Sequence, residues 1–283
     1  MRIGICCIVK QENLYLRDWV KYYHDMGVKK IVLYDNNDIN GEYPQQVIGD
    51  YIASGFVDYK NARGLYRYQI EAYNKCYNEY VDEFDWMGFL DIDEYWYLDS
   101  HLTFDDFFSE ERFPNATVIF LNWLCYGDDN KIHYEPLPVQ ERFKIPSQPI
   151  ISEWNAVKKV FVKCDRELNM VFFDVNGVYS ANEDGTTRNK PYTSDGKPFI
   201  PEFKVDFTNS YIKHYRTLTI EEFLYRRFGR RGYADLGSPF LKERVMRIFW
   251  EQNEWTEEKQ EIVNKFFENY KIEEDAPDTC IYF

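Results

Sequence analysis

The chain has 283 residues, of which 45% are hydrophobic, so it can bury the core of one large α/β domain or of two small ones. It carries 48 acidic and 34 basic residues, and its formal net charge is −14. A surface of this charge repels nucleic acid and anionic bilayers, which excludes broad binding to either and leaves only contact through a local basic patch.

Cysteine usage and the start of the chain indicate a cytoplasmic protein. The six cysteines are scattered and form no C-x-x-C pair, which favours reduced thiols. The first expected strand begins at Arg2 or Ile3, which leaves no room for a signal peptide, and no apolar run approaches the ~18 residues of a membrane-spanning helix. We therefore expect a cytoplasmic location, with a peripheral position at the inner face of the plasma membrane as a further option.

The first hundred residues alternate between strands and helices. Apolar runs predict four strands, at Ile3–Val9, Ile31–Tyr34, Phe56–Tyr59 and Met87–Leu90. A helix that ends at Gly27 is indicated by apolar residues at helical spacing, namely Leu16, Trp19, Val20 and Tyr23. A second such stripe consists of Tyr66, Ile70, Tyr73, Tyr77 and Val81. This β-α-β order with short connections predicts a parallel sheet covered by helices.

The remainder of the chain is less regular and ends in helices. Three further strands are expected, at Val118–Trp123, Val157–Val162 and Met170–Val175. The longest loop is expected at Asn176–Pro201, a length typical of a functional lid or a disordered segment. A helix begins after Thr219, which forms a capping box with Glu222, and another begins at Thr256 and runs towards Tyr270.

The most informative segment is Trp86–Tyr95, an apolar run that ends in the carboxylates Asp91, Asp93 and Glu94. If the strand continues, Asp91 and Asp93 project to the same side, because side chains alternate along a strand. Two neighbouring carboxylates repel each other unless a cation or a proton lies between them. Their oxygens suit Mg²⁺ or Mn²⁺, which can also hold a substrate's phosphates. The alternative is a strand that runs into an acidic turn, with one aspartate capping the next segment.

Four segments in chain order carry a family resemblance. They are Ile8–Glu12 with Leu16–Trp19, Gly27–Asn36, Trp86–Glu94, and His214–Arg216 with Glu221–Phe223 and Arg231–Gly232. Together they resemble the motifs of glycosyltransferase family 92, which is related to the family 2 glycosyltransferases of GT-A fold. The resemblance covers residues 3–235. It implies a nucleotide-sugar donor, a divalent metal and inversion at the anomeric carbon.

The expected fold class is therefore α/β, of the GT-A (Rossmann-like) type. We expect a central, mostly parallel sheet flanked by helices, with a C-terminal helical segment. A single domain is expected over residues 1–283. Residues 1–100 would form the nucleotide-sugar-binding half, residues 101–215 the acceptor half, and residues 216–283 the C-terminal helices.

The resemblance also implies roles around the acidic segment. Asp93 would coordinate the metal directly and act as a catalytic residue. Asp91 would reach the donor ribose, or the metal through water. His214 would be a third ligand, to the metal or to the diphosphate. Glu94 is expected on the other face of the strand, with a supporting role.

Further donor contacts are expected at the ends of the first two strands. The resemblance implies that Asp35 accepts a hydrogen bond from the uracil imide or from a ribose hydroxyl, with Asn36 assisting. Val9 and Lys10 would line the base, with Glu12 nearby. The alternative role for Asp35 is a turn cap, which aspartate commonly provides.

Two groups of basic or polar residues have competing interpretations. Arg67 and Gln69, on the helix before the acidic segment, face either the donor or solvent. Four arginines cluster around Gly229: Arg226, Arg227, Arg230 and Arg231. In an acidic protein this cluster indicates binding of the donor diphosphate, or of an anionic lipid or polyprenyl-phosphate acceptor at a membrane. The alternative is a solvated helix end that pairs with Glu221 and Glu222.

Sugar transfer also requires a base for the acceptor hydroxyl. The candidates are Asp128, Asp129 and Glu153, with Glu153 first because it adjoins Trp154, a residue able to stack on a sugar. The predicted function is a metal-dependent (Mn²⁺ or Mg²⁺) inverting glycosyltransferase. It would move a hexose from a UDP-sugar to a glycan or lipid-linked saccharide in surface polysaccharide or lipopolysaccharide assembly. We expect no nucleic-acid ligand, and the sequence indicates no obligate protein partner.

Two alternatives belong to other classes of protein. A haloacid-dehalogenase-type phosphatase also carries D-x-D after an apolar run. Its motif normally continues with Thr or Val two residues after the second aspartate, where this chain has Tyr95. The other alternative is a catalytically inactive sugar- or protein-binding module on the same fold.

Overall fold

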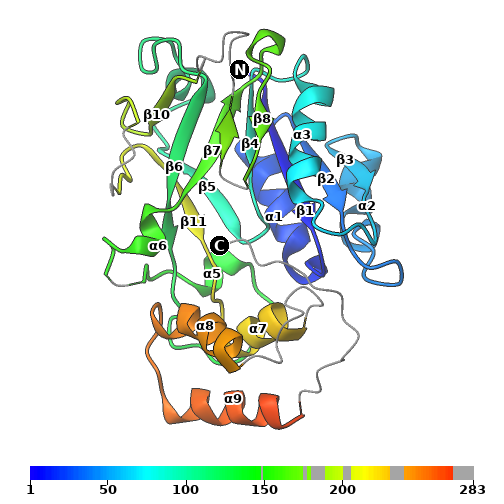
Figure 1. Cartoon of the computed structure of the whole chain (residues 1–283), viewed down its shortest axis with the longest axis vertical. Coiled ribbons are helices and arrows are strands. Elements are labelled where there is room, and N and C mark those ends of the chain that lie inside the picture. The colour runs from blue at the N-terminus through cyan, green and yellow to red at the C-terminus, as the bar shows by residue number, and fades with distance from the viewer. Residues whose placement is uncertain (148, 175–176, 180–188, 200–204, 230–238, 270–283) are drawn as a thin grey trace. The chain divides into compact units, whose positions relative to one another are not determined.

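The structure is a computed structural model, and it describes residues 1–147, 149–174, 177–179, 189–199, 205–229 and 239–269 (Figure 1). Within these ranges nine strands form one sheet, in the order β3-β2-β1-β4-β7-β6-β11-β5, with β10 beside β6. Their bounds are β1 Ile3–Val9, β2 Lys30–Asp35, β3 Val57–Asn61, β4 Trp86–Phe89, β5 Glu94–Leu98, β6 Val118–Cys125, β7 Lys158–Lys163, β10 Pro191–Thr193 and β11 Ser210–His214.

The helices alternate with the strands in the first part of the chain and dominate its end. Their bounds are α1 Asn13–Met26, α2 Gln45–Ala53, α3 Gln69–Tyr80, α4 Phe104–Phe107, α5 Val139–Arg142, α6 Glu153–Ala156, α7 Ile220–Leu224, α8 Pro239–Trp250 and α9 Glu257–Asn269. A 3₁₀ turn, η1, spans Arg166–Leu168, and a π-helical turn, η2, spans Tyr225–Gly229. None of the described helices is both long and apolar enough to cross a bilayer.

The expected fold class is confirmed as an α/β protein whose central sheet is mostly parallel and flanked by helices. β1 pairs in parallel with β2 and β4, and β2 pairs in parallel with β3. β7 reverses direction and pairs antiparallel with both β4 and β6. In this register Val9 lies opposite Asp35, and Cys6 lies opposite Phe89. The carboxyl ends of β1, β2 and β4 therefore meet at one edge, as follows from the predicted parallel order.

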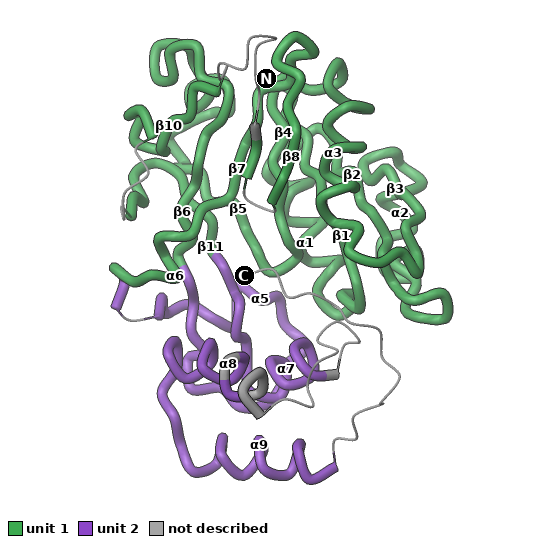
Figure 2. Tube along the Cα trace, viewed as in Figure 1, with its two compact units in different colours: residues 1–124, 151–213 green, residues 125–150, 214–283 purple. Residues whose placement is uncertain are grey.

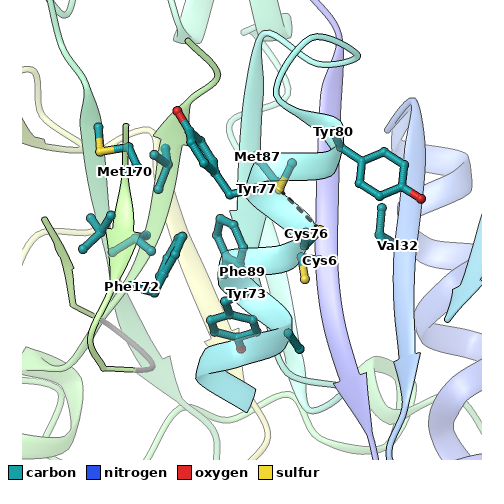
Figure 3. Packing of buried hydrophobic residues seen from close by; sticks show 14 of the residues in the cluster. Cys6, Val32, Tyr73, Cys76, Tyr77, Tyr80, Met87, Phe89, Met170 and Phe172 are labelled. Carbon is teal, nitrogen blue, oxygen red and sulfur yellow. Dashed lines mark hydrogen bonds between the residues drawn. The ribbon is translucent and has the colours of Figure 1, made fainter. Parts of the chain in front are cut away.

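A buried cluster fixes α3 against one face of this sheet (Figure 3). Its aromatic centre is Tyr73, whose ring lies 4.9 Å from that of Phe89, which in turn lies 4.2 Å from Phe172. Cys76 contacts Met87 through sulfur, 3.6 Å apart. Because α3 begins at Gln69, this packing also fixes where Gln69 lies relative to the sheet edge.

Several predicted elements differ from the structure. The strand expected at Met170–Val175 is only β8, Val171–Phe172, which pairs antiparallel with β9, Val178–Tyr179, outside the main sheet. The loop expected at Asn176–Pro201 contains β9 and β10, and β10 pairs in parallel with β6. β10 exists through its pairing with a distant segment, β6, which no local pattern records. Residues 175–176, 180–188 and 200–201 of these expectations lie outside the described residues.

The chain divides into two compact units, residues 1–124 with 151–213, and residues 125–150 with 214–283 (Figure 2). The first unit contains most of the sheet, with α1, α2 and α3. The second contains α5, α7, α8 and α9. Thr219 and Glu222 form the expected capping box at the start of α7. The single-domain expectation and its internal divisions stay a prediction.

We predict that Gly88→Ala destabilises the protein by about 1–3 kcal/mol, the usual cost of overpacking a core. A Cβ atom at Gly88 would lie 2.6 Å from the Phe161 ring, between β4 and β7. Gly49→Ala in α2 is the control, because a Cβ there meets nothing within 4 Å. Urea denaturation measures both changes, and equal midpoints for the two variants would contradict this packing.

Candidate active site

The three carboxylates lie in a turn at the sheet edge and not on an extended strand. β4 ends at Phe89, and β5 begins at Glu94. The Glu94 N–H donates to the Asp91 carbonyl at 3.1 Å, which closes a β-turn over Asp91–Glu94. The expectation that Asp91 and Asp93 share a strand face is therefore wrong, and the structure shows the acidic turn of the alternative interpretation. Strand alternation does not apply, because the chain reverses direction here to start β5.

Glu94 anchors this acidic turn from inside the protein. Its carboxylate is fully buried and accepts the Asp91 N–H at 2.9 Å. Its carbonyl accepts hydrogen bonds from Trp19 Nε1 at 2.8 Å and from the Tyr23 hydroxyl at 3.0 Å. The expected supporting role for Glu94 thus has a geometric basis, with α1 holding the turn through Trp19 and Tyr23.

Lys159 of β7 is the partner that sequence reasoning missed. Its ammonium lies 2.7 Å from Asp91 Oδ2 and 3.3 Å from Glu94 Oε2. The side chain of Lys159 is 1% exposed, that of Glu94 is fully buried, and that of Asp91 is 38% exposed. The cation that relieves repulsion in the acidic turn is therefore a lysine of the protein itself. One signal was present, because a lysine inside the apolar run Val157–Val162 needs an anionic partner.

Burial and neighbouring charges shift the pKa of Lys159 in opposite directions. Burial alone favours the neutral amine of Lys159, but the Asp91 and Glu94 carboxylates outweigh it and raise the pKa of Lys159 well above its usual value. Full burial raises the pKa of Glu94, and the charges of Asp91 and Asp93 raise it further, while Lys159 offsets part of the rise. The ammonium of Lys159 stays charged and pairs most closely with Asp91.

Gln69 completes the surroundings of Asp91. Its amide nitrogen lies 3.2 Å from Asp91 Oδ1 and 2.9 Å from the Tyr73 hydroxyl. Arg67 lies before α3 and not on it, with a left-handed φ of 48°. Its exposed guanidinium lies 5.2 Å from the centre of the Tyr66 ring. The structure therefore brings Gln69 to the acidic turn, and a donor contact of Arg67 stays a prediction.

Asp35 holds the loop that follows β2. It is fully buried and accepts hydrogen bonds from the Asn37 backbone and side chain, at 3.0 and 2.7 Å. The Tyr59 hydroxyl and Arg63 Nη1 each lie 2.7 Å from its second oxygen. Arg63 also donates to the Glu42 and Asp38 carbonyls, at 2.7 Å each. These contacts favour the alternative role of Asp35 as a loop anchor, and its contact with a nucleotide stays a prediction.

The other expected donor residues belong to the same edge. Lys10 Nζ lies 3.1 Å from Asp38 Oδ1, so the loops after β1 and β2 are joined. Val9 is buried at the end of β1, and Glu12 is 7% exposed at the N-terminus of α1. The Asn36 amide donates to the Ala62 and Leu65 carbonyls, at 2.8 Å each. The structure thus brings these residues together, and their contact with a donor stays a prediction.

The acidic turn fits a divalent cation held mainly by a substrate's phosphates. Both Asp91 oxygens already have partners, which suits contact with a metal through water. Asp93 is half-buried in the same turn. Mg²⁺ commonly keeps several waters and takes one or two carboxylates plus phosphates. Among the described residues, no three His, Cys, Asp or Glu side chains are grouped as a metal site, so a cage made of protein ligands alone is not present there.

Further predicted site residues are His214, Glu153 and the arginines around Gly229, and they lie outside the acidic turn and the loops after β1 and β2 in the sequence. His214 lies in the second unit, 4% exposed, and its carbonyl accepts the Tyr126 N–H at 2.9 Å. Glu153 is exposed at the start of α6 in the first unit. Arg226 is buried within η2, and Arg230 and Arg231 lie outside the described residues. The metal, base and phosphate roles assigned to them stay predictions.

Asp128 and Asp129 lie in the second unit and are engaged by the protein. Asp128 is 2% exposed, and its Oδ2 lies 2.5 Å from Lys259 Nζ. Burial raises the pKa of Asp128, and the Lys259 ammonium offsets part of the rise. Asp129 accepts the backbone N–H groups of Lys144 and Ile145, at 2.7 and 3.2 Å. These contacts favour structural roles for both aspartates.

Comparison with known proteins identifies the family. A model of glycosyltransferase family 92 matches residues 3–274. The chain belongs to glycosyltransferase family 92. This confirms the resemblance read from the four sequence segments, and it gives the phosphatase alternative no support.

The relatives of this family 92 chain are distant. A glycosyltransferase family 92 protein of Ricinus communis is 25% identical over 123 residues, 44% of this chain and 22% of that protein. One of Arabidopsis thaliana is 26% identical over 97 residues, 34% of this chain and 16% of that protein. The matched regions therefore span less than a quarter of either relative.

The matches to solved structures are weaker still. S. aureus TarS residues 1–349 matches at 12% identity with a TM-score of 0.43, over 95% of this chain and 72% of that one. The same fragment in complex with UDP-GlcNAc matches with a TM-score of 0.34, over 48% of this chain and 37% of that one.

We predict that Lys159→Met destabilises the protein by about 3–5 kcal/mol, because it leaves a buried carboxylate without its cation. Lys158→Met is the matched control. Lys158 Nζ donates to the neutral Ala156 carbonyl at 2.9 Å and lies 5.5 Å from the centre of the Phe199 ring, so we expect a change below about 1.5 kcal/mol.

The double variant Lys159→Met/Glu94→Gln should recover part of the stability that Lys159→Met loses, because it also removes a buried carboxylate. Urea denaturation monitored by circular dichroism measures all three variants. A Lys159→Met variant as stable as the wild type would show that the ammonium does not hold the acidic turn.

Proposed function

We propose that this chain is a metal-dependent inverting glycosyltransferase. It transfers a hexose from a nucleotide sugar, UDP-linked in the first instance, to a glycan or lipid-linked saccharide. The observation that carries the proposal is the acidic turn Asp91–Glu94, held by Lys159 at the carboxyl edge of the sheet in a family 92 chain. Ligands of open α/β sheets bind at this edge.

The acidic turn separates the roles of its two aspartates. Lys159 and Gln69 fix both oxygens of Asp91, so this carboxylate is positioned and partly neutralised. It therefore suits a ribose hydroxyl, or a metal-bound water, better than direct coordination. Asp93 is the direct ligand in this proposal. A bound Mn²⁺ or Mg²⁺ would supply the charge that stabilises the departing diphosphate.

The loops after β1 and β2 form the nucleotide side of the proposed site. In this proposal Asp35 orders the loop backbone by accepting hydrogen bonds from Arg63 and Asn37. Both of its carboxylate oxygens are used in these contacts, so it does not bind the nucleotide directly. Lys10 joins the two loops by its ion pair with Asp38. In this proposal the nucleobase of the donor packs on these two loops, which the contacts above order before the donor binds.

Glu153 remains the first candidate for the base. A general base must come within hydrogen-bond reach of the proton that it removes. Glu153 is exposed, whereas Asp128 is buried and paired with Lys259. The proposed acceptor is a saccharide of a surface polysaccharide or lipopolysaccharide.

We predict that purified protein slowly hydrolyses a UDP-hexose in the presence of Mn²⁺, and that Asp93→Ala lowers this rate by at least about 100-fold. The loss follows because the metal contributes several kcal/mol of charge stabilisation at the transition state. Release of UDP measures the rate, and circular dichroism checks the fold. Asp105→Ala is the control, since this carboxylate is 75% exposed on α4 outside the acidic turn.

Full hydrolysis in EDTA, or in the Asp93→Ala variant, would refute the metal role. Hydrolysis of simple phosphomonoesters through an aspartyl phosphate would instead support the phosphatase alternative. Donor binding without any turnover, in the presence of varied acceptors, would support the inactive module.

A further inference from the structure

The second unit contains a cavity of about 540 Å³ that the proposed chemistry does not use. It lies between the loop after β6, the segment around Pro146 and the turn that follows α8. Its lining comprises Gly127, Asp128, Asp129, Asn130, Ile145, Pro146, Ser147, Trp250, Glu251, Gln252, Asn253 and Glu254. The volume falls in the range of small-molecule sites.

Two buried polar side chains in this lining have no hydrogen-bond partner among the residues that the structure describes. Gln252 is 6% exposed, and neither its amide oxygen nor its amide nitrogen has a hydrogen-bond partner among the described residues. Ser147 is 8% exposed, and its hydroxyl likewise lacks a partner within the described part of the chain. An unsatisfied buried polar group costs about 1–3 kcal/mol, so such groups in folded proteins normally meet water or a ligand.

The types of these groups indicate which ligand fits. The amide of Gln252 can both donate and accept, and so can the hydroxyl of Ser147. A ligand rich in hydroxyl groups can both donate to and accept from these side chains, because each hydroxyl also donates and accepts. An anion offers only acceptors, and an ammonium offers only donors.

The charges around the cavity exclude an anionic ligand. Its lining has four carboxylates, and none of its described lining residues is a lysine or an arginine. The nearby Lys259 ammonium is fully buried and already occupied by Asp128 and by the Glu254 carbonyl, at 2.5 and 2.6 Å. A phosphate or nucleotide would therefore be repelled, whereas a neutral ligand would not.

An exposed aromatic side chain completes the cavity. The Trp250 indole is 42% exposed, and its orientation is held by an edge-to-face contact with Trp255 at 5.8 Å. Indole rings combine a broad apolar face with a polar edge. The apolar face of a pyranose ring can pack on such a surface while its hydroxyls reach the polar groups nearby.

The backbone of the cavity is fixed before any ligand binds. Asn253 Oδ1 accepts the Asp128 N–H at 2.6 Å, and its amide donates to the Phe249 carbonyl at 2.9 Å. A Cβ atom at Gly127 would lie 3.1 Å from both Asn253 Oδ1 and the Gln252 carbonyl. The turn after α8 and the loop after β6 are therefore locked together, which lowers the entropy cost of binding.

We infer that this cavity is a binding subsite for a neutral saccharide, with Trp250 as the stacking surface and Gln252 and Ser147 as hydroxyl partners. The role of the cavity as an acceptor-binding subsite rests on the proposed function. Binding of a neutral saccharide in the cavity does not depend on that function. The subsite would hold part of the acceptor glycan within the second unit.

Ligand-observed saturation-transfer NMR on the full chain tests this inference. The probes are lactose, cellobiose and the methyl glycosides of glucose, galactose, mannose, N-acetylglucosamine, fucose and xylose. We expect at least one to bind, and expect Trp250→Ala and Gln252→Leu each to raise its Kd at least about tenfold, equivalent to 1.4 kcal/mol. Ser147→Ala should weaken binding without altering the fold. Tyr225→Ala is the control, an equally exposed aromatic outside the cavity.

Binding by none of the probes, or binding that survives both Trp250→Ala and Gln252→Leu, would overturn the inference. Melting curves check that each variant is folded. Asp93→Ala separates this inference from the proposed function, because it should keep saccharide binding while losing donor hydrolysis. Saccharide binding that depends on Trp250 in a protein without donor hydrolysis would refute the proposed function and leave the subsite standing.

Discussion

The buried ammonium of Lys159 is the contact on which the candidate active site depends. Removing a carboxylate or an ammonium from water costs several kcal/mol per ion, and only close partners offset that cost. Asp91 and Glu94 supply these partners, and in return Lys159 lets two carboxylates and Asp93 share one short turn. Because Lys159 belongs to β7 and the turn joins β4 to β5, these two ion pairs connect three strands of the sheet.

The same arrangement of buried opposite charges recurs at other loops. Arg63 pairs with the fully buried Asp35 and orders the loop after β2. Arg142 and Glu222 form a bidentate pair at 2.8 and 2.9 Å between α5 and the start of α7. Lys259 pairs with Asp128 beneath the cavity of the second unit. In a protein of net charge −14 these basic side chains act as internal loop supports.

Local patterns correctly predicted the strands and helices β1, α1, β2, β3, α3 and β4 of the first unit. The runs that became β1, β2 and β4 are apolar because both faces of these strands are covered, and Gly27 ends α1 in the left-handed conformation that glycine adopts most easily. The convergence of polar segments at one sheet edge followed from the parallel order. The patterns missed β10, because a strand of three residues depends on its pairing with β6, far away in sequence. At Asp91 they left a strand and a turn as alternatives, and the structure shows the turn.

The sequence by itself therefore determined the family, the α/β class and the edge at which the chemistry-bearing carboxylates lie, because periodicity and short motifs are local properties. Only the tertiary structure decided that Asp91 faces Lys159, that Asp35 is enclosed by four donors, and that Gln252 and Ser147 line one cavity. Each of these outcomes joins residues from separate elements. Their electrostatic and hydrogen-bond energies depend on distance and burial in space, which no local pattern encodes.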